Sequence, residues 1–453
     1  MMSLNDTIVA CATAAGYSSI AVLRVNGPET KHYINKIFQS KNTEAELVPN
    51  RAYYGRIVNP QTGDLIDRVL VTFFEGPYSY TGEDVAEVSC HGNPVIVEKI
   101  VALLTNLGAR LAQRGEFTKR SLLNGKIDLL QAEAVLDTVQ ATCDEARKLA
   151  IAQYEGKLSE KIYELRSQIV DLLSLVEANI DFPEEEEVQD VLNSSKSQIA
   201  DKISVIISAI DILLKGAELG RKIKEGYKVL IVGRANVGKS TLFNKMIGFD
   251  RAITHEEPGT TRDYIDACIE LHGLYIWLYD TAGFLDKATG LNIIAQQRSL
   301  KLLDQADLVL LVFDGSEPIN EQDISLYSLT KEENRVLIVN KIDMNVRLNE
   351  STILSDSIKL SAKTGENLDM LTKCINEKLI RTSVPKQVFL TKQRHVDALK
   401  KVNDYLEKGM SAVSSELVAF ELHSALETIG ELTGKVMRKD ILEKIFNDFC
   451  IGK

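Results

Sequence analysis

Cysteine is scarce and scattered in this chain of 453 residues. The six cysteines form no C-x-x-C pair, and they are Cys11, Cys90, Cys143, Cys268, Cys374 and Cys450. A disulfide framework and a structural zinc site both need closely spaced cysteines. The sequence therefore argues against both.

Long hydrophobic runs and an excess of positive charge are also missing. No apolar run approaches the roughly 18 residues that a membrane-spanning helix needs, and the first residues (MMSLND) lack the features of an export signal. We therefore expect a cytoplasmic protein with no membrane association. The net charge of −11 disfavours strong non-specific binding to nucleic acid. Work on nucleic acid would need a local basic patch or a basic partner.

Four segments with three kinds of sequence pattern follow one another along the chain, whose length predicts two to four domains. Short β-like runs fill residues 1–119, and helical periodicity follows in 120–220. Residues 221–380 alternate β and α patterns, and 381–453 are helical again. We predict a multidomain protein of the α+β and α/β classes. Its parts are an N-terminal α+β domain, a helical bundle made of two separate pieces, and an inserted P-loop domain with a mostly parallel sheet.

Individual helices are signalled by caps and periodicity. Asn93 and Pro94 predict a helix start, and Gly108 follows its end. Residues 127–154 contain no Gly or Pro and predict one helical run, and a further helix is expected over 194–215.

The clearest chemical motif is GRANVGKS at residues 233–240, which follows the apolar strand pattern VLIV and precedes a helical stretch. It fits G-x-x-x-x-G-K-[S/T], in which backbone N–H groups and a helix N-terminus surround phosphate oxygens. Lys239 would reach the β- and γ-phosphates, and Ser240 would offer its hydroxyl to Mg²⁺. The predicted nucleotide contacts in this motif are Asn236, Val237, Gly238, Lys239, Ser240 and Thr241.

Two further segments would face the γ-phosphate. A strand pattern over 274–279 ends in DTAG, where Asp280 would hold Mg²⁺ through water. The segment GTTRD at 259–263 is typical of a switch loop, in which Thr261 would be the second hydroxyl ligand of Mg²⁺. The predicted nucleotide contacts here are Thr260, Thr261, Asp280, Thr281, Ala282 and Gly283.

The identity of the bound base is predicted by the motif NKID at residues 340–343, which follows a third apolar strand pattern. Guanine presents the N1–H and N2–H₂ donors side by side, and the Asp343 carboxylate can accept both, whereas adenine lacks this pair. Asn340 and Lys341 belong to the same motif, and SAK at 361–363 would meet the guanine O6. The predicted contacts there are Ser361, Ala362 and Lys363. The four motifs together predict a GTPase fold.

The flanking segments carry a family resemblance. They read DTIVA (6–10), RVNGP (24–28), YTGED (80–84), RGEFTKR (114–120), LNGKIDL (123–129), QAEA (131–134) and CIGK (450–453). With the GTPase motifs they closely resemble the tRNA-modification GTPase MnmE (TrmE) family over essentially the whole chain. The resemblance implies a GTP-hydrolysing enzyme with a folate-binding N-terminal domain that forms a homodimer.

The resemblance also implies partners and a reaction. The family forms a heterotetramer with an FAD-containing partner, MnmG (GidA), and adds a carboxymethylaminomethyl-type group to C5 of the wobble uridine of certain tRNAs. The one-carbon unit comes from 5,10-methylenetetrahydrofolate, for which 5-formyltetrahydrofolate is an analogue. By position, the folate contacts are Arg24, Glu87, Lys126 and Lys453, although the first three could also be ordinary surface charges. Cys450 would act at the modification site or be a terminal thiol without chemistry.

For GTP hydrolysis, Phe284 and Leu285 stand where a water-orienting glutamine might be expected, and no arginine finger is evident. The resemblance implies activation by K⁺-dependent dimerisation of the GTPase domains. Its K⁺ contacts would be Asn236, His255, Glu257 and Thr260, where His255 replaces a more usual Thr. Asn292 occupies the position of the family's catalytic Glu and cannot accept a proton, which predicts slower hydrolysis or a substitute such as Asp286.

The alternative to a tRNA-modifying enzyme is a regulatory GTPase switch without one-carbon chemistry.

Overall fold

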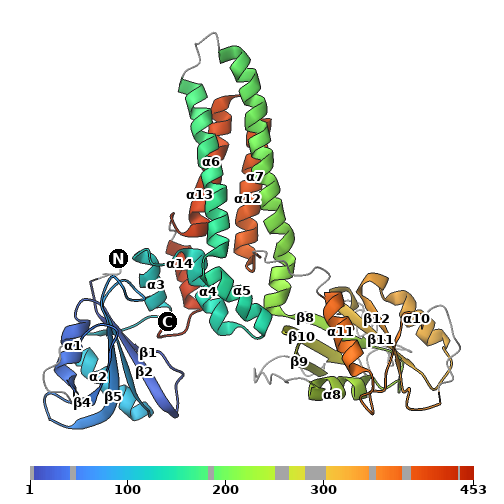
Figure 1. Cartoon of the computed structure of the whole chain (residues 1–453), viewed down its shortest axis with the longest axis horizontal. Helices are drawn as coiled ribbons and strands as arrows, with labels where there is room; N and C mark the ends of the chain where they lie inside the picture. Colours follow the sequence, from blue (N-terminus) through green and yellow to red (C-terminus); the bar gives the residue numbers. More distant parts are fainter. Residues whose placement is uncertain are drawn as a thin grey trace. The chain divides into compact units, whose positions relative to one another are not determined.

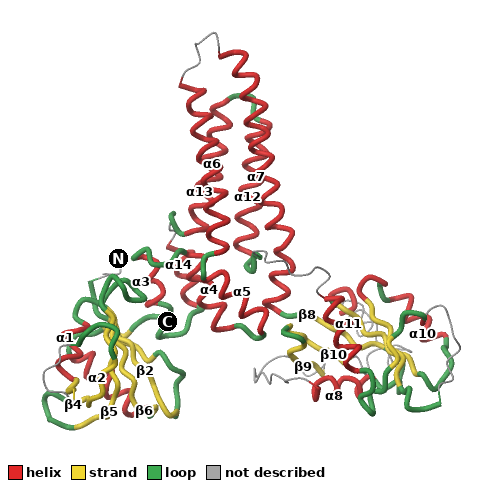
Figure 2. The backbone as a smooth tube through the Cα atoms, in the orientation of Figure 1, coloured by secondary structure: helices red, strands yellow, loops and turns green. Residues whose placement is uncertain are grey.

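The structure is a computed structural model that describes residues 5–40, 47–181, 188–249, 265–280, 302–345, 354–379, 389–436 and 439–453. The chain packs into two compact units. The first unit comprises Met1–Asp137, Gln153–Ile207 and Lys400–Lys453, and the second comprises Thr138–Ala152 and Ser208–Leu399. Figure 1 shows the course of the chain, and Figure 2 distinguishes its helices from its strands.

The first unit contains a seven-stranded sheet of order β3-β4-β5-β6-β2-β1-β7. Its strands are β1 (Ile8–Cys11), β2 (Ser18–Asn26), β3 (Phe38–Ser40), β4 (Ala52–Val58), β5 (Leu65–Phe74), β6 (Val85–Gly92) and β7 (Arg110–Leu111). All neighbours are antiparallel except β1 and β7. One face buries α1 (Thr30–Ile37) and α2 (Pro94–Asn106) in an apolar core. The predicted cap of α2 is confirmed, because Asn93 Oδ1 accepts from the Val95 N–H at 2.9 Å.

In the first unit, C-terminal helices pack against helices from the N-terminal half of the chain. They include α3 (Glu116–Leu123), α4 (Leu129–Gln140), α6 (Lys157–Asp181), α13 (Ser415–Thr433) and α14 (Lys439–Asn447). The long helix α13 packs along α6 (Figure 1). A second apolar cluster joins Leu122 and Leu129 to Phe446 and Phe449, so α14 is anchored on α3 and α4. Two other long helices are α7 (Val188–Glu225), which extends beyond the predicted 194–215, and α12 (Gln393–Ser411).

The second unit is built on a six-stranded sheet of order β13-β12-β11-β8-β10-β9. Its strands are β8 (Tyr227–Val232), β9 (Ile265–Leu271), β10 (Leu274–Asp280), β11 (Leu308–Asp314), β12 (Arg335–Asn340) and β13 (Ile358–Lys359). Every pair is parallel except the β9–β10 hairpin. Its named helices are α8 (Lys239–Phe249), α10 (Glu321–Leu329) and α11 (Leu368–Leu379), and η2 (Glu332–Asn334) is a short 3-10 turn. The central strands are almost wholly apolar, as expected of a parallel sheet covered on both faces.

The prediction of one helical run over 127–154 is wrong. Helix α4 ends at Gln140 and α5 (Asp144–Tyr154) begins anew, with most of α5 belonging to the second unit. The first turn of α5 donates its N–H groups to the β9–β10 hairpin: Asp144 N–H to Glu270 Oε1 at 3.3 Å and Glu145 N–H to the Gly273 carbonyl at 3.2 Å. These distant acceptors satisfy the new N-terminus and so favour the break.

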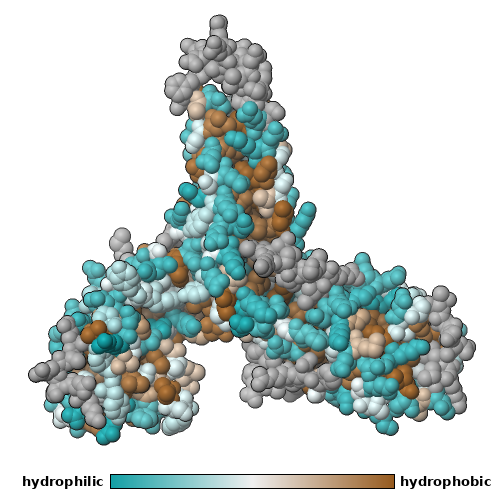
Figure 3. All heavy atoms as spheres, in the orientation of Figure 1, coloured by the Kyte–Doolittle hydropathy of each residue, from teal (hydrophilic) through white to brown (hydrophobic). Residues whose placement is uncertain are grey.

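The outer face of the β9–β10 hairpin is buried by α5 and the end of α7. Cys143, Ala146, Ile223, Cys268 and Tyr275 form one apolar cluster there. Among the described helices none is long and apolar enough to cross a membrane. Hydrophilic residues are spread over all described parts of the visible face (Figure 3).

Candidate nucleotide-binding site

The predicted nucleotide motifs lie at the carboxyl ends of neighbouring strands in the second unit. The loop of residues 233–238 follows β8, Asp280 ends β10, Asn340 ends β12, and Ser361 follows β13. Because β8, β10, β12 and β13 run in the same direction, their carboxyl ends meet at one edge of the sheet. Ligands of open α/β sheets bind at this edge.

The loop between β8 and α8 has a backbone that only small residues allow. Asn236 and Gly238 have φ values of +65° and +98°. A Cβ atom on Gly238 would lie 2.3 Å from Asn340 Nδ2, and one on Gly233 would lie 2.5 Å from the Val312 carbonyl oxygen. Both glycines are therefore required by close contacts, and successive N–H groups in such a loop form an anion-binding concavity.

The first turn of α8 separates its side chains by environment. Lys239 is buried, and its Nζ donates to the carbonyl oxygens of Gly233 at 2.8 Å and Arg234 at 2.7 Å. Ser240 and Thr241 are exposed, as is Asn236, whereas Val237 is buried. The ammonium group of Lys239 is thus held under the loop, and the hydroxyl groups face solvent.

Asn340 joins three of the motifs. Its Nδ2 donates to the Val237 carbonyl oxygen at 2.8 Å, and its Oδ1 accepts from the Ala362 N–H at 2.9 Å. The side chain is 2% exposed, so both bonds are protected from water. Asn340 therefore holds the loop of residues 233–238 and the SAK segment at the end of β12.

The carboxylate of Asp343 is also positioned by the SAK segment. Ser361 Oγ donates to Asp343 Oδ1 at 2.7 Å, and this hydrogen bond lowers the pKa of Asp343. Asp343 is consequently an ionised acceptor over the whole neutral range. Lys363, the last residue of the segment, is exposed.

Other predicted residues lie outside the part of the chain that the structure describes. They are His255, Glu257, Thr260, Thr261, Thr281, Ala282, Gly283 and Asn292. Asp280 is described, and its side chain is 6% exposed at the end of β10.

In the first unit, two of the predicted folate contacts bind each other. Arg24 donates through Nη2 to Glu87 Oε1 at 2.7 Å, and through Nη1 to the Gly452 carbonyl oxygen at 3.2 Å. Its guanidinium lies 5.5 Å from the ring centroid of Phe117. Arg24 therefore brings β2, β6 and the C-terminal tail together.

Lys126 binds a different segment, because its Nζ donates to the Pro77 carbonyl oxygen at 2.8 Å. Lys453 follows Gly452 and is partly exposed. Cys450 is exposed, and its carbonyl oxygen accepts from the Gly115 N–H at 3.3 Å. The tail is thus bound through its backbone at Cys450 and Gly452.

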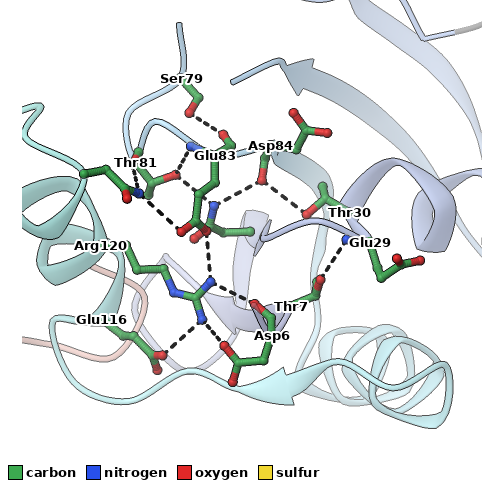
Figure 4. A network of polar contacts seen from close by, with 12 residues as sticks. Asp6, Thr7, Glu29, Thr30, Ser79, Thr81, Glu83, Asp84, Glu116 and Arg120 are labelled. Carbon is green, nitrogen blue, oxygen red and sulfur yellow. Dashed lines mark hydrogen bonds and ion pairs between the residues drawn. The ribbon is translucent and has the colours of Figure 1, made fainter. Parts of the chain in front are cut away.

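The first unit also contains a buried ionic network that was not predicted. Arg120, whose side chain is 3% exposed, contacts Asp6 at 2.5 Å, Glu83 at 2.9 Å and Glu116 at 3.4 Å (Figure 4). Arg110 adds contacts to Asp6 at 2.8 Å and Glu116 at 2.6 Å. Burial opposes ionisation of Asp6 and Glu116, but the bonds from Arg110 and the charge of Arg120 leave the pKa of each below its ordinary value.

Further hydrogen bonds hold the segment that carries YTGED, which contributes Glu83 to the network. Asn26 Nδ2 donates to Thr81 Oγ1 at 2.8 Å, and Ser121 Oγ donates to the Tyr80 carbonyl oxygen at 2.8 Å. The Tyr80 hydroxyl lies 3.0 Å from Thr118 Oγ1. No sequence signal pairs these residues, since their partners lie many positions away along the chain.

Comparison with known proteins extends over both units. Residues 7–126 match the family model for the GTP-binding protein TrmE N-terminus, and residues 129–450 match the model for the MnmE helical domain. The tRNA modification GTPase MnmE of Natranaerobius thermophilus is 37% identical over 461 residues, which cover 99% of this chain and 100% of that protein. The chain belongs to the tRNA modification GTPase MnmE family.

A second MnmE family relative, from Aquifex aeolicus, is 38% identical over 456 residues, covering 99% of this chain and 100% of that protein. Among solved structures, the G domain of the FeoB iron transporter of T. maritima is 26% identical and covers 34% of this chain and 97% of that chain. Its TM-score of 0.27 is too low to support an argument. The MnmE assignment depends on the family models and the full-length relatives.

One residue that contacts an MnmE nucleotide motif was not identified from the sequence. Asp314 ends the apolar strand β11 (LVLLVFD), and its Oδ2 accepts from Lys341 Nζ at 2.6 Å. An acidic residue at the end of a buried strand was the signal that marked Asp280, so the same signal could have marked Asp314.

Proposed function

We propose that this protein is a GTP-hydrolysing enzyme that takes part in tRNA modification. The observation that carries the proposal is the position of Asn340, whose side chain bonds the 233–240 loop and the SAK segment at one sheet edge. Membership of the MnmE family supports the link to tRNA. The nucleotide would lie across this edge, with its phosphates at the loop after β8 and its base at NKID.

Guanine would be selected by Asp343. The Ser361 hydroxyl holds this carboxylate ionised and oriented, and an ionised carboxylate can accept two parallel N–H donors. The exocyclic amine of adenine lies where guanine carries O6, and adenine offers no second donor beside it. The contact therefore favours GTP over ATP, with Ala362 and Lys363 beside the base.

The residues of the loop after β8 fit a triphosphate with Mg²⁺. The close contacts at Gly233 and Gly238 leave space for backbone and none for side chains, as a phosphate cradle requires. Lys239 would exchange its carbonyl contacts for the β- and γ-phosphates. The exposed hydroxyl of Ser240, with Thr261 and the carboxylate of Asp280 acting through water, would hold Mg²⁺.

Hydrolysis would depend on K⁺ and on pairing of two GTPase domains. Asn236 supports this part of the proposal, because it lies exposed in the loop and has a left-handed backbone conformation. His255, Glu257 and Thr260 would complete the K⁺ contacts. A cation there would supply the charge that an arginine finger gives other GTPases. Asn292, in place of Glu, would orient water without accepting a proton, so we propose slow turnover.

The first unit would supply the one-carbon chemistry. Arg24, Lys126 and Lys453 could bind the glutamate carboxylates of a folate, and Glu87 could accept from its pterin once it exchanges its bond with Arg24. We propose 5,10-methylenetetrahydrofolate as the donor, a homodimer through the N-terminal domain, and a heterotetramer with the FAD-containing MnmG. The product would carry a carboxymethylaminomethyl-type group on C5 of the wobble uridine. Cys450 would act there through its thiol, since the residue is exposed and its carbonyl group binds the tail to Gly115.

A reconstituted reaction tests the proposal. The protein, MnmG with FAD, 5,10-methylenetetrahydrofolate, glycine or ammonium as the amine donor, GTP and unmodified tRNA are combined, and the wobble nucleoside is analysed by mass spectrometry. We expect a mass increase that requires each component. The Asp343→Asn variant should need xanthosine triphosphate in place of GTP, because an amide pairs with the C2 carbonyl of xanthine. GTP turnover with an unchanged wobble uridine would instead support a regulatory switch without one-carbon chemistry.

A further inference from the structure

Asp314 ends β11 next to Asn340 of the NKID motif, although no nucleotide motif includes it. Its carboxylate is 4% exposed, and its Oδ2 accepts from Lys341 Nζ at 2.6 Å. Its Oδ1 accepts from the Ser316 N–H at 2.9 Å and the Ser316 hydroxyl at 2.6 Å. Both oxygens are therefore engaged, and the carboxylate has one fixed orientation.

The backbone around this pair is equally constrained. Asp314 and Asn340 are register partners in the parallel pair β11–β12, and the Gly315 N–H donates to the Asn340 carbonyl oxygen at 2.7 Å. A Cβ atom on Gly315 would lie 2.7 Å from that oxygen. Lys341 then turns with φ +67°, a left-handed conformation that a lysine rarely adopts. The strand ends are thus tied by backbone and by side chain at the same place.

We propose that Asp314 is a positioning residue that holds the Lys341 side chain in its nucleotide-binding orientation. This inference rests on the proposed GTP function. A free lysine side chain has many rotamers, and ordering it on binding costs free energy. Asp314 orders Lys341 beforehand, so the cost is met in folding and affinity rises. Burial alone would raise the pKa of Asp314, but the hydrogen bonds from Lys341 and Ser316, together with the charge of Lys341, outweigh it and the pKa is lowered.

A merely structural salt bridge is the competing explanation, and the chain offers a matched control for it. Asp307 immediately precedes the same strand β11, and it also binds a lysine, Lys222, and the Lys228 N–H. This pair lies at the opposite end of β11 from the nucleotide motifs. Removing either carboxylate should affect stability, but only Asp314 should affect nucleotide affinity.

The test measures the Kd of the full-length protein for a fluorescent GDP analogue with Mg²⁺, and KM and kcat for GTP. Asp314→Asn should weaken binding and raise KM about tenfold or more, the usual effect of losing a charge-assisted hydrogen bond. The kcat should change little, because Lys341 belongs to the proposed base contacts and not to the residues proposed to hold the γ-phosphate and Mg²⁺. Asp307→Asn should leave Kd and KM within about twofold of wild type.

A double-mutant cycle assigns the effect to Lys341. Lys341→Met keeps the aliphatic stem and removes the ammonium group, so it should lose as much affinity as Asp314→Asn. The combined variant should lose no more than either single one. Full additivity, or wild-type affinity in Asp314→Asn, would overturn the inference. If Asp314→Asn does not fold, wild-type Kd in Lys341→Met overturns it. Failure of the wild-type protein to bind the analogue would instead refute the proposed function.

Discussion

The side-chain amide of Asn340 donates to the carbonyl oxygen of Val237 at 2.8 Å, although the two residues are 103 positions apart. The bond joins the end of β12 to the loop after β8. Through it, the residues proposed to contact the base and those proposed to contact the phosphates belong to one rigid arrangement.

We predict that Asn340→Ala weakens nucleotide binding and also destabilises the fold. The substitution leaves the Val237 carbonyl and the Ala362 N–H without their partner, at about 1–3 kcal/mol for each buried group. Titration with a fluorescent GDP analogue should show at least a tenfold rise in Kd. Asn367→Ala is the control, because Asn367 donates to the Lys359 carbonyl oxygen in a more exposed setting. Equal Kd values for the two variants would contradict the prediction.

We predict that the buried ionic network makes the first unit sensitive to acid. The folded-state pKa values of Asp6 and Glu116 lie below their ordinary values of 3.8 and 4.5. Such carboxylates stabilise the fold above the ordinary pKa, and the contribution is lost as the pH falls through the lowered values. Arg110→Met should therefore lower stability most above about pH 4.5, and the difference from wild type should shrink toward pH 2.

The measurement is the urea midpoint by circular dichroism at several pH values between 7 and 2. Arg56→Met is the control, since Arg56 is exposed and its Nε donates to the uncharged side chain of Gln39. A destabilisation by Arg110→Met that is the same at every pH would show that the network does not act through these carboxylates.

We predict that Gly452→Ala detaches the C-terminal tail. Gly452 has φ +95°, and a Cβ atom there would lie 2.4 Å from the Cys11 carbonyl oxygen. The tail must move, so the Gly115 N–H loses its acceptor on Cys450 and should exchange with deuterium faster. Gly63→Ala is the control, because Gly63 also has positive φ but no atom within 4 Å of the added Cβ. Unchanged exchange at Gly115 would contradict the prediction.

We predict that Glu270→Ala loosens α5. The Glu270 carboxylate accepts from the Asp144 N–H in the first turn of the helix, and loss of such a cap costs about 0.5–2 kcal/mol. Hydrogen exchange of the first α5 amides should accelerate, while that of α6 should not. Glu270→Gln keeps an acceptor and should restore most of the protection. Equal acceleration in both variants would assign the effect to charge alone.

Local signals in the sequence predicted much of this architecture. The cap at Asn93 and the strand patterns before residues 233 and 340 need only neighbouring residues, and each corresponds to an observed element. The order of the nucleotide motifs, each at the end of a strand pattern, predicted a GTPase fold. The structure brings Val237, Asn340 and Ala362 together there.

Features that depend on distant partners could not be predicted. The break between α4 and α5 is favoured by acceptors on Glu270 and Gly273, more than a hundred residues away. Nothing in the sequence pairs Arg120 with Asp6 and Glu83, which the fold brings to it. In both cases the deciding free energy comes from long-range burial and hydrogen bonding, which leave no periodic pattern in the sequence.

The most direct test of the account is the initial rate of phosphate release from GTP and from ATP, measured with Mg²⁺ in KCl and in NaCl at equal ionic strength. We expect turnover of GTP only, faster in KCl than in NaCl, and abolished in Lys239→Ala. Release from ATP at a similar rate, or an unchanged rate in Lys239→Ala, would contradict a guanine-nucleotide site at this sheet edge. Equal GTP turnover in the two salts would contradict the K⁺-dependent mechanism.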